Sequence, residues 1–226
     1  MEKKLFTRIW QFVYAIIILL FTSSCEADDF KTDTFTDPRD GNAYNTVTIG
    51  TQTWMAENLR YLPSVVSPLR QSQYTVYYYV YGYDGTNIEE AKATANYKTY
   101  GVLYNWTAAK AACPAGWHLP TDEEWTQLTE YLGASDAGGK LKEKGTKHWN
   151  SPNTGASNKA NFTALPGGGR FSTYQFTYLG DMGYWWTDSH DGTGLYYYRY
   201  IQQNDKGIMR GYVVRDAGFS VRCVKD

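Results

Sequence analysis

Residues 113–125 read Cys-Pro-Ala-Gly-Trp-His-Leu-Pro-Thr-Asp-Glu-Glu-Trp, and this stretch decides the fold. It contains the start of a helix, because the Thr121 hydroxyl can accept a hydrogen bond from the backbone N–H three residues later while Glu124 reaches back. Apolar residues then recur three and four positions apart until Gly133. This pattern predicts a helix over residues 121–132.

The segment just upstream predicts another helix, over residues 103–112. It is rich in alanine, and Leu103, Trp106, Ala109 and Cys113 lie three or four positions apart, which gives one apolar stripe that ends at Pro114. These two segments are the main predicted helices. A glycine-rich segment at 138–142 predicts at most a short third one.

Strands are predicted on both sides of the helices. Residues 44–50 alternate between apolar and polar side chains, a second extended segment covers 53–59, and the tyrosine-rich residues 63–100 predict a long loop or hairpin. Six more strands are predicted at 162–165, 171–179, 184–188, 195–202, 208–215 and 219–224. Tight turns separate them, and residues 167–169, all glycine, are interpreted as one of these turns. Short strands joined by tight turns indicate antiparallel sheet, so the fold class is α+β with helices early and sheet late.

The first residues have the pattern of an export signal. Lys3 and Arg8 precede a short apolar run at 9–21, and small residues follow directly before Cys25. We predict a signal peptide over residues 1–24 and lipidation of Cys25, which anchors the chain in the outer membrane. The acidic residues 26–29 resemble the surface-export signal of Bacteroidetes lipoproteins and indicate display at the cell surface. The alternatives are a cleaved signal without lipid, or an uncleaved anchor.

The polar residues that follow predict a lipidated tether over residues 25–40, and the domain then covers residues 41–226. If Cys25 carries lipid, the chain has two other cysteines, Cys113 and Cys223. An oxidising exported compartment favours a disulfide between them, whereas two buried free thiols are the alternative. No Cys-x-x-Cys motif is present and there are only three histidines, so we predict no metal site.

Composition limits the function classes. The chain has 22 Lys and Arg against 23 Asp and Glu, and this balance argues against a nucleic-acid partner. Aromatic residues make up 17% of the chain, which suits half-buried strands and ligand-facing surfaces. The sequence contains no nucleophile elbow, phosphate-binding loop or His-Glu-x-x-His motif, so we expect neither an enzyme nor a cofactor.

Four ordered blocks carry a family resemblance. They are residues 46–59 (Thr-Val-Thr-Ile-Gly-Thr-Gln-Thr-Trp-Met-Ala-Glu-Asn-Leu), 100–106 (Tyr-Gly-Val-Leu-Tyr-Asn-Trp), 113–125 and 218–226 (Gly-Phe-Ser-Val-Arg-Cys-Val-Lys-Asp). Together they resemble the Fibrobacter succinogenes major paralogous domain over about residues 40–226. This resemblance implies an exported protein or lipoprotein and specifies no reaction.

A more distant similarity concerns the fold. Cys113, His118, Glu124, a distal pair of tryptophans and Cys223 on the last strand follow in the order found in C-type lectin-like domains. The similarity implies a lectin-like fold with a long-range disulfide from the first helix to the last strand. Formylglycine-generating enzymes share a segment like 119–125, but they need two redox cysteines near the C-terminal end, where this chain has one. We therefore expect no such chemistry.

Calcium-dependent sugar binding has weak sequence support. Calcium lectins use Glu-Pro-Asn or Gln-Pro-Asp followed by Trp-Asn-Asp, because several oxygen ligands must share one cation with sugar hydroxyls. This chain has none of these triplets, and the nearest remnants are residues 186–188 and 204–205. We expect recognition without calcium, with a calcium-bridged sugar as the alternative.

The lectin similarity implies that loops between residues 164 and 212 gather at one end, where aromatic and charged side chains predict a binding patch. The predicted ligand-binding residues are Arg170, Trp185, Trp186, Asp188, Tyr196, Tyr198 and Arg199. The alternative is that strand alternation directs half of them into the core, with Tyr196, Tyr198 and Tyr200 on one face and Arg199 on the other.

These observations predict a surface-exposed outer-membrane lipoprotein with a non-catalytic domain that binds a glycan or a protein partner. The alternative is a structural or assembly component of a surface complex that has no small-molecule ligand.

Overall fold

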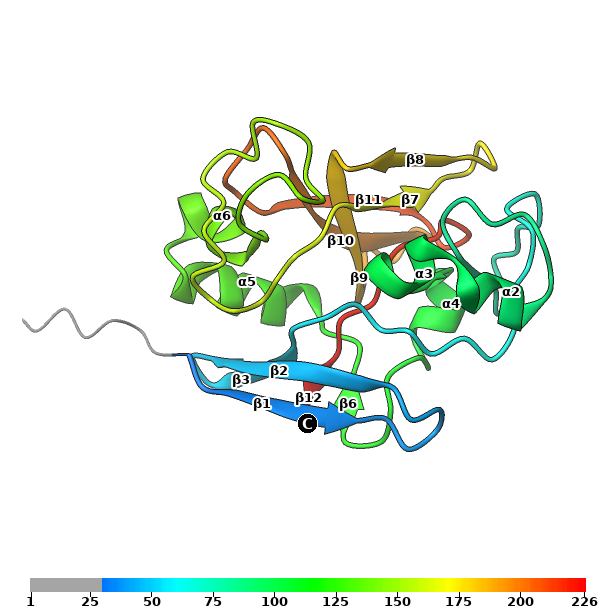
Figure 1. Ribbon diagram of the computed structural model, residues 1–226, viewed down its shortest axis with the longest axis horizontal. Helices are drawn as coiled ribbons and strands as arrows, with labels where there is room; N and C mark the ends of the chain where they lie inside the picture. Colours follow the sequence, from blue (N-terminus) through cyan, green and yellow to red (C-terminus); the bar gives the residue numbers. More distant parts are fainter. Residues whose placement is uncertain (1–29) are drawn as a thin grey trace, which may run out of the picture.

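The computed structural model describes residues 30–226. Figure 1 shows two sheets at opposite sides of the view, with helices beside them. The predicted signal peptide (1–24) and the lipidation site Cys25 lie outside the described residues. Part of the predicted tether is ordered structure instead, because Thr32–Thr36 forms strand β1 and pairs with the next strand along the chain. The alternation of threonine with Asp33 and Phe35 is typical of a strand, although the segment is also polar enough to resemble a linker.

The two larger sheets each have five strands. The first has the order β1 (Thr32–Thr36), β2 (Ala43–Ile49), β3 (Gln52–Met55), β12 (Val224–Lys225) and β6 (Trp117–His118). The second has the order β11 (Met209–Val214), β10 (Leu195–Gln202), β9 (Met182–His190), β7 (Gly167–Arg170) and β8 (Phe176–Leu179). The short strands β4 (Tyr78–Tyr79) and β5 (Leu103–Tyr104) form a third sheet. Strand pairing is antiparallel as predicted, except that β7 and β9 run parallel.

The helices are short except for α5. Their bounds are α2 (Ile88–Ala93), α3 (Ala95–Tyr100), α4 (Trp106–Ala109), α5 (Asp122–Tyr131), the 3-10 helix η1 (Ala134–Asp136) and α6 (Ala137–Leu141). Helix α5 begins at the predicted capping box: Thr121 accepts from the backbone N–H of Glu124, and the Glu124 carboxylate accepts from the N–H of Thr121. The prediction of a helix from residue 121 is therefore confirmed.

The predicted helix over residues 103–112 is wrong. Leu103 and Tyr104 are strand β5, and α4 has only four residues. The reason is Asn105, whose side chain caps α4 and also donates to the carbonyl oxygens of Ser72 and Thr75 at 2.9 and 2.8 Å. These tertiary contacts override the helix propensity of the alanines.

The segment predicted as a long loop or hairpin contains helices α2 and α3 as well as strand β4. Asn87 and Thr94 cap the two helices. Residues of these types are typical of helix starts, whereas the high tyrosine content of the segment favours a strand or loop. The predicted strand at 162–165 is reduced to one bridge between Lys142 and Ala164.

The glycines at 167–169 were predicted to form a turn, but they form β7 in the interior. The strand needs glycine because the neighbouring chain is too close for a side chain. A Cβ on Gly168 would lie 2.4 Å from the carbonyl oxygen of Thr177 on β8, and its φ is +61°. A Cβ on Gly169 would lie 2.8 Å from the ring of Phe219.

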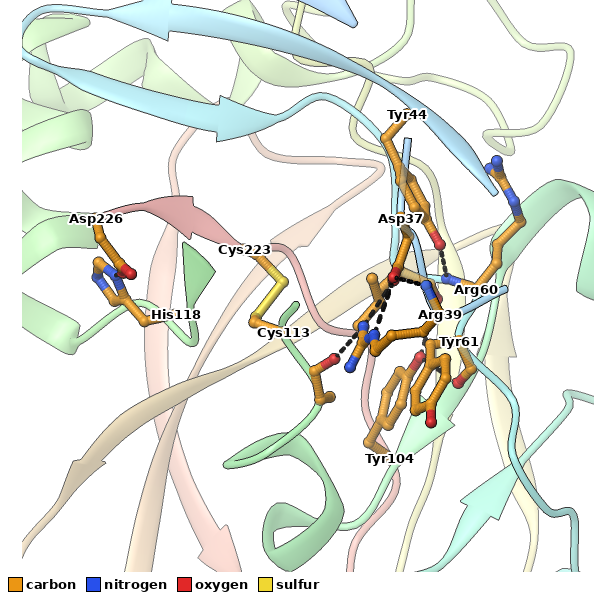
Figure 2. Close-up of a disulfide and its surroundings, with 12 residues drawn as sticks. Asp37, Arg39, Tyr44, Arg60, Tyr61, Tyr104, Cys113, His118, Cys223 and Asp226 are labelled. Atoms are coloured by element: carbon orange, nitrogen blue, oxygen red, sulfur yellow. Dashed lines mark hydrogen bonds and ion pairs between the residues drawn. A yellow bond between two sulfur atoms is a disulfide. The ribbon is translucent and has the colours of Figure 1, made fainter. Parts of the chain in front are cut away.

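The predicted disulfide between Cys113 and Cys223 is present, with a sequence separation of 110 residues. It connects the segment after α4 to the residue before β12. Strand β12 lies between β3 and β6, so the end of the chain completes the sheet that begins with β1. Figure 2 shows the bond beside Arg39, whose guanidinium group donates to the Asp37 carboxylate and to the carbonyl oxygen of Ala112.

The interior has two hydrophobic cores. One is centred on Trp125 of α5, whose ring centroid lies 4.8 Å from that of Trp54 and 6.0 Å from that of Trp185. The other includes Trp186 and Phe219, whose ring centroids are 4.7 Å apart. Strand β9 separates the two cores, and its successive tryptophans point to opposite sides.

Candidate functional site

Three of the predicted ligand-binding residues lie in the interior. Arg170, Trp185 and Trp186 are each 0% exposed. Arg170 donates to the carbonyl oxygens of Pro68 and Asp216, and the two indole N–H groups donate to the side chain of Asn58 and the carbonyl oxygen of Tyr104. Both tryptophans therefore lie in the core, and neither forms part of the surface.

Arg199 also faces inward. It donates to the Oδ1 atom of Asp122 at 2.6 Å and to the hydroxyl of Thr126 at 2.7 Å. Both partners belong to the α5 region, so this side chain fastens the helix to β10. The predicted alternation along β10 is confirmed. Arg199 and Ile201 face α5 and its core, while Tyr196, Tyr198 and Tyr200 face the other way.

Tyr196, Tyr198 and Tyr200 share the other face of β10. The Tyr198 ring lies 5.8 Å from Tyr200 and 4.8 Å from Phe219, and it covers Gly211 on the neighbouring strand. Tyr198 and Tyr200 are half-buried, so one side of each ring contacts the core and the other contacts solvent. Of the predicted ligand-binding residues on β10, Tyr198 therefore reaches the surface, and Tyr200 beside it is an addition to the predicted set.

Residues from distant segments extend this face. The Trp106 ring of α4 lies 4.2 Å from the ring of Tyr196. The Arg215 guanidinium carbon lies 5.1 Å from the ring centre of Tyr196 and 5.1 Å from that of Tyr74. Tyr74 is 79% exposed. We call the six residues Tyr74, Trp106, Tyr196, Tyr198, Tyr200 and Arg215 the aromatic face.

Charged groups border the aromatic face. Asp188, a predicted site residue at the end of β9, forms an ion pair with Lys110. The His190 ring lies 5.5 Å from that of Tyr196. A carboxylate, an ammonium group and an imidazole therefore lie beside a surface of rings and a guanidinium group, so the site offers both stacking area and directional hydrogen bonds.

Two tyrosine hydroxyls of this region, those of Tyr198 and Tyr184, are neutral at physiological pH. Burial raises the pKa of Tyr198, and the nearby Tyr200 raises it further. Burial also raises the pKa of Tyr184, which lies beneath the face, well above its ordinary value. These phenols can donate and accept hydrogen bonds, and they add no negative charge to the surface.

Sequence reasoning missed Tyr74, Trp106, Lys110 and Arg215 as members of this site. Trp106 lies in one of the family blocks, and Arg215 ends a predicted strand, but nothing in the sequence places either beside Tyr196. The contact depends on the backbone N–H of Trp106, which donates to the carbonyl oxygen of Arg215 at 2.9 Å.

The side chain of His118 contacts two carboxylates. Its Nε2 atom lies 2.8 Å from the Glu124 carboxylate and its Nδ1 atom lies 2.7 Å from that of Asp226. Burial acts to lower the pKa of His118, but the hydrogen bonds to the two carboxylates outweigh it and raise the pKa above its ordinary value. The imidazole thus ties the start of α5 to the end of the chain.

The described part of the chain contains neither a cluster of metal ligands nor a membrane-spanning helix. Among residues 30–226, no three His, Cys, Asp or Glu side chains are grouped so that they could hold a metal ion. The calcium-site remnant Asp205 is part of a turn, in which its Oδ1 atom accepts from the N–H of Gly207. Over the same residues, no helix combines the length and apolar character needed to cross a membrane.

Comparison with known proteins identifies the family. The model of the Fibrobacter succinogenes major domain matches residues 47–225, which include the whole sheet from β7 to β11, most of the sheet that begins with β1, and the disulfide. The chain belongs to this family. No curated protein and no solved structure matches the chain significantly. The matched segment begins within β2, so β1 precedes the part of the chain that the family model describes.

Proposed function

We propose that this member of the Fibrobacter succinogenes major domain family is a surface-exposed outer-membrane lipoprotein whose domain binds a glycan without catalysis. The location is supported by the sequence before Phe30: a basic start, a short apolar run and small residues before Cys25. The binding role is supported by the aromatic face.

The observation that carries the proposal is the exposure of Tyr74 beside Arg215. The ring of Tyr74 is 79% exposed, so most of its apolar surface is in contact with water. Stacking on the apolar face of a sugar ring would bury part of that surface, which is favourable. Arg215 contacts the rings of both Tyr74 and Tyr196, and these contacts restrict a guanidinium group whose N–H groups can donate to hydroxyl or carboxylate oxygens. A ligand therefore finds a surface that needs little ordering.

We also propose that the fold is a variant of the C-type lectin-like domain. Support comes from the disulfide, which joins a segment after an early helix to the last strand, and from the insertion of β12 beside β3. In this arrangement the aromatic face takes the place of a calcium-dependent sugar site.

The experiment is a glycan array probed with the full-length protein and with Tyr74→Ala. We expect at least one glycan class to bind the wild type, and we expect binding to fall about tenfold in the variant, since loss of one stacking ring costs roughly 1 kcal/mol or more. Tyr212→Ala is the matched control, because Tyr212 on β11 is also highly exposed, at 66%. Its neighbour Val213 packs against the core beneath the aromatic face, so Tyr212 points to the opposite side of the sheet. Equal binding by the wild type and Tyr74→Ala would reject the site.

A protein partner or an assembly role is the second candidate, favoured by the open edges of the sheets. Strands β1 and β11 each pair on one side only, and an unpaired strand edge can add a strand from another chain. Purification from membranes with a stoichiometric partner, together with a silent glycan array, would favour this function over the first.

A further inference from the structure

A second site lies between strand β2 and the segment that connects α6 to β7. A groove of about 570 Å³ is lined there by Asn45, Glu57, Asn158, Asn161 and Thr163, among others. Figure 1 shows the connecting segment, in yellow-green, passing above β2. Glu57 and Thr163 also line a smaller cavity of about 90 Å³, so the two spaces share a wall.

The lining of the larger space is almost entirely neutral and polar. Hydroxyl and amide groups dominate it, Glu57 is its one charged side chain, and Ala56 is its one apolar side chain. Such a surface gives an apolar ligand nothing to pack against, whereas it offers many donors and acceptors to a ligand that carries hydroxyl groups. A saccharide is the ligand class with that chemistry.

The wall of the groove is held in a conformation that most residues avoid. Asn158, Asn161 and Thr163 have φ values of 50°, 52° and 50°, and for a β-branched threonine this is an outlier. The Asn158 side chain fixes the turn, because its Oδ1 atom accepts from the N–H of Thr163 at 2.8 Å and its Nδ2 atom donates to the Thr163 hydroxyl at 3.0 Å.

A buried arginine supports the same turn from below. Arg222 is 1% exposed and donates to the carbonyl oxygens of Phe162 and Thr163, while its Nε atom donates to the side chain of Asn58 at 3.0 Å. The strained backbone is therefore fixed by hydrogen bonds on both sides. Strain that the surrounding structure maintains at the wall of a cavity points to a preorganised binding surface.

The smaller cavity adds positive charge at one end of the groove. Arg60, Lys98 and Arg222 line it against the single carboxylate of Glu57. Arg60 pairs with Glu57, and the N–H groups of Arg222 are engaged by Asn58 and two carbonyl oxygens. Lys98 differs, since among residues 30–226 its ammonium group has no hydrogen-bonding or ion-pair partner. It is the group able to contact an anion directly.

We infer that this groove binds an acidic oligosaccharide, whose hydroxyl groups contact the amide and hydroxyl side chains near Asn161 while a carboxylate or sulfate lies at Lys98. The site shares no residue with the aromatic face and does not depend on it. The positive end selects for charge, and the neutral part selects for a hydroxyl-bearing ligand over a peptide.

The test is a binding titration of the full-length protein with tetragalacturonate and a sulfated heparin tetrasaccharide, against neutral cellotetraose and a tetra-aspartate peptide. We expect an acidic saccharide to bind at least tenfold more tightly than cellotetraose and the peptide. Lys98→Ala and Asn161→Ala should each weaken binding of the acidic saccharide about tenfold. Lys98→Ala removes one charge-assisted hydrogen bond and Asn161→Ala removes two neutral ones, and either loss has about this effect on affinity. Lys144→Ala and Asn204→Ala, at exposed positions outside the groove, are the matched controls.

Thermal melting of each variant establishes that it is folded. The proposal is overturned if neither acidic saccharide binds, if cellotetraose or the peptide binds as tightly, or if both groove variants bind like the wild type. Loss of binding in Tyr74→Ala alone would place the saccharide on the aromatic face, which would support the proposed function and reject the groove. If Tyr74→Ala binds the acidic saccharide normally and Lys98→Ala does not, the groove is supported.

Discussion

Arg39 donates a hydrogen bond to the carbonyl oxygen of Ala112 at 2.8 Å, one residue before the disulfide cysteine Cys113. The same guanidinium group pairs with Asp37, whose side chain is fully buried. The turn between β1 and β2 is thereby fastened to the segment that follows α4, so residues 30–40 belong to the folded domain.

We predict that Arg39→Ala lowers the free energy of unfolding by about 2 to 3 kcal/mol, because it leaves the buried carboxylate of Asp37 without its cation. Burial acts to raise the pKa of Asp37, and the bonds from Arg39 reverse that effect and lower it. Denaturant unfolding near pH 7 measures the loss. Asp40→Ala, at the neighbouring exposed position, is the control and should change stability by less than about 0.5 kcal/mol.

We predict that loss of the disulfide costs up to about 5 kcal/mol, because the bond between Cys113 and Cys223 closes a loop of 110 residues in the unfolded chain. The double variant Cys113→Ser and Cys223→Ser should unfold at a much lower denaturant concentration than the oxidised wild type. Reductant should bring the wild type close to the variant and leave the variant unchanged. An oxidised protein no more stable than the reduced one would contradict the prediction.

We predict that Gly168→Ala is far more damaging than Gly192→Ala. Both glycines have positive φ, but a Cβ on Gly168 would collide with the main chain of β8, whereas nothing lies within 4 Å of one on Gly192. The first change should cost about 3 kcal/mol or more and the second about 1 kcal/mol. Thermal melting of the two variants measures the difference, and similar melting temperatures would mean that β7 is not packed against β8.

Local sequence signals predicted the elements that depend on neighbouring residues. The capping box at Thr121 and Glu124 determines where α5 begins, and alternation along β10 determines which tyrosines share a face. Cysteine counting predicted the disulfide because only two cysteines follow Cys25. The helix start and the strand alternation are each determined by a few neighbouring residues. The disulfide could be predicted because each of the two cysteines has only one possible partner.

The rest depended on contacts between distant segments. Nothing near Trp186 shows that Tyr104 accepts its indole N–H, and nothing near Gly168 shows that β8 passes too close for a side chain. The aromatic face could be predicted in part from Tyr196 and Tyr198, but Tyr74 and Arg215 reach it only through the packing of three separate segments. Aromatic content alone could not separate core rings from surface rings.

We predict that His118 makes the protein lose stability as the pH rises. The pKa of His118 is raised in the folded state, so over a range of pH the folded chain holds a proton that the unfolded chain has released. The stability that this proton contributes is complete below the unfolded-state pKa and is lost as the pH rises through the folded-state pKa. NMR titration should give His118 a pKa above 6.5, and Asp226→Asn should lower it. His118→Gln should remove the part of the pH dependence that sets in as the pH rises past the ordinary histidine pKa of about 6.5. A titration at or below the ordinary value would contradict the assigned hydrogen bonds.

Lys142 should produce the opposite dependence. Its side chain is fully buried, and its ammonium group donates to the carbonyl oxygens of Gln202 and Asp205 at 3.1 and 2.8 Å without a direct carboxylate partner. Burial lowers the pKa of Lys142 to about 8, and the distant charge of Asp205 only partly opposes it. Above pH 8 the unfolded chain keeps a proton that the folded chain has released, so the free energy of unfolding rises with pH.

The expected gain from Lys142 is at most about 2 kcal/mol between pH 8 and 9.5, because each pH unit contributes at most about 1.4 kcal/mol per proton. Denaturant unfolding at several pH values measures it. Lys142→Met should remove the slope, although it lowers stability at every pH by leaving two carbonyl oxygens without a donor. Lys144→Met, at an exposed position in the same segment, should keep the wild-type slope. Equal slopes in Lys142→Met and the wild type would mean that this buried amine stays protonated throughout the range.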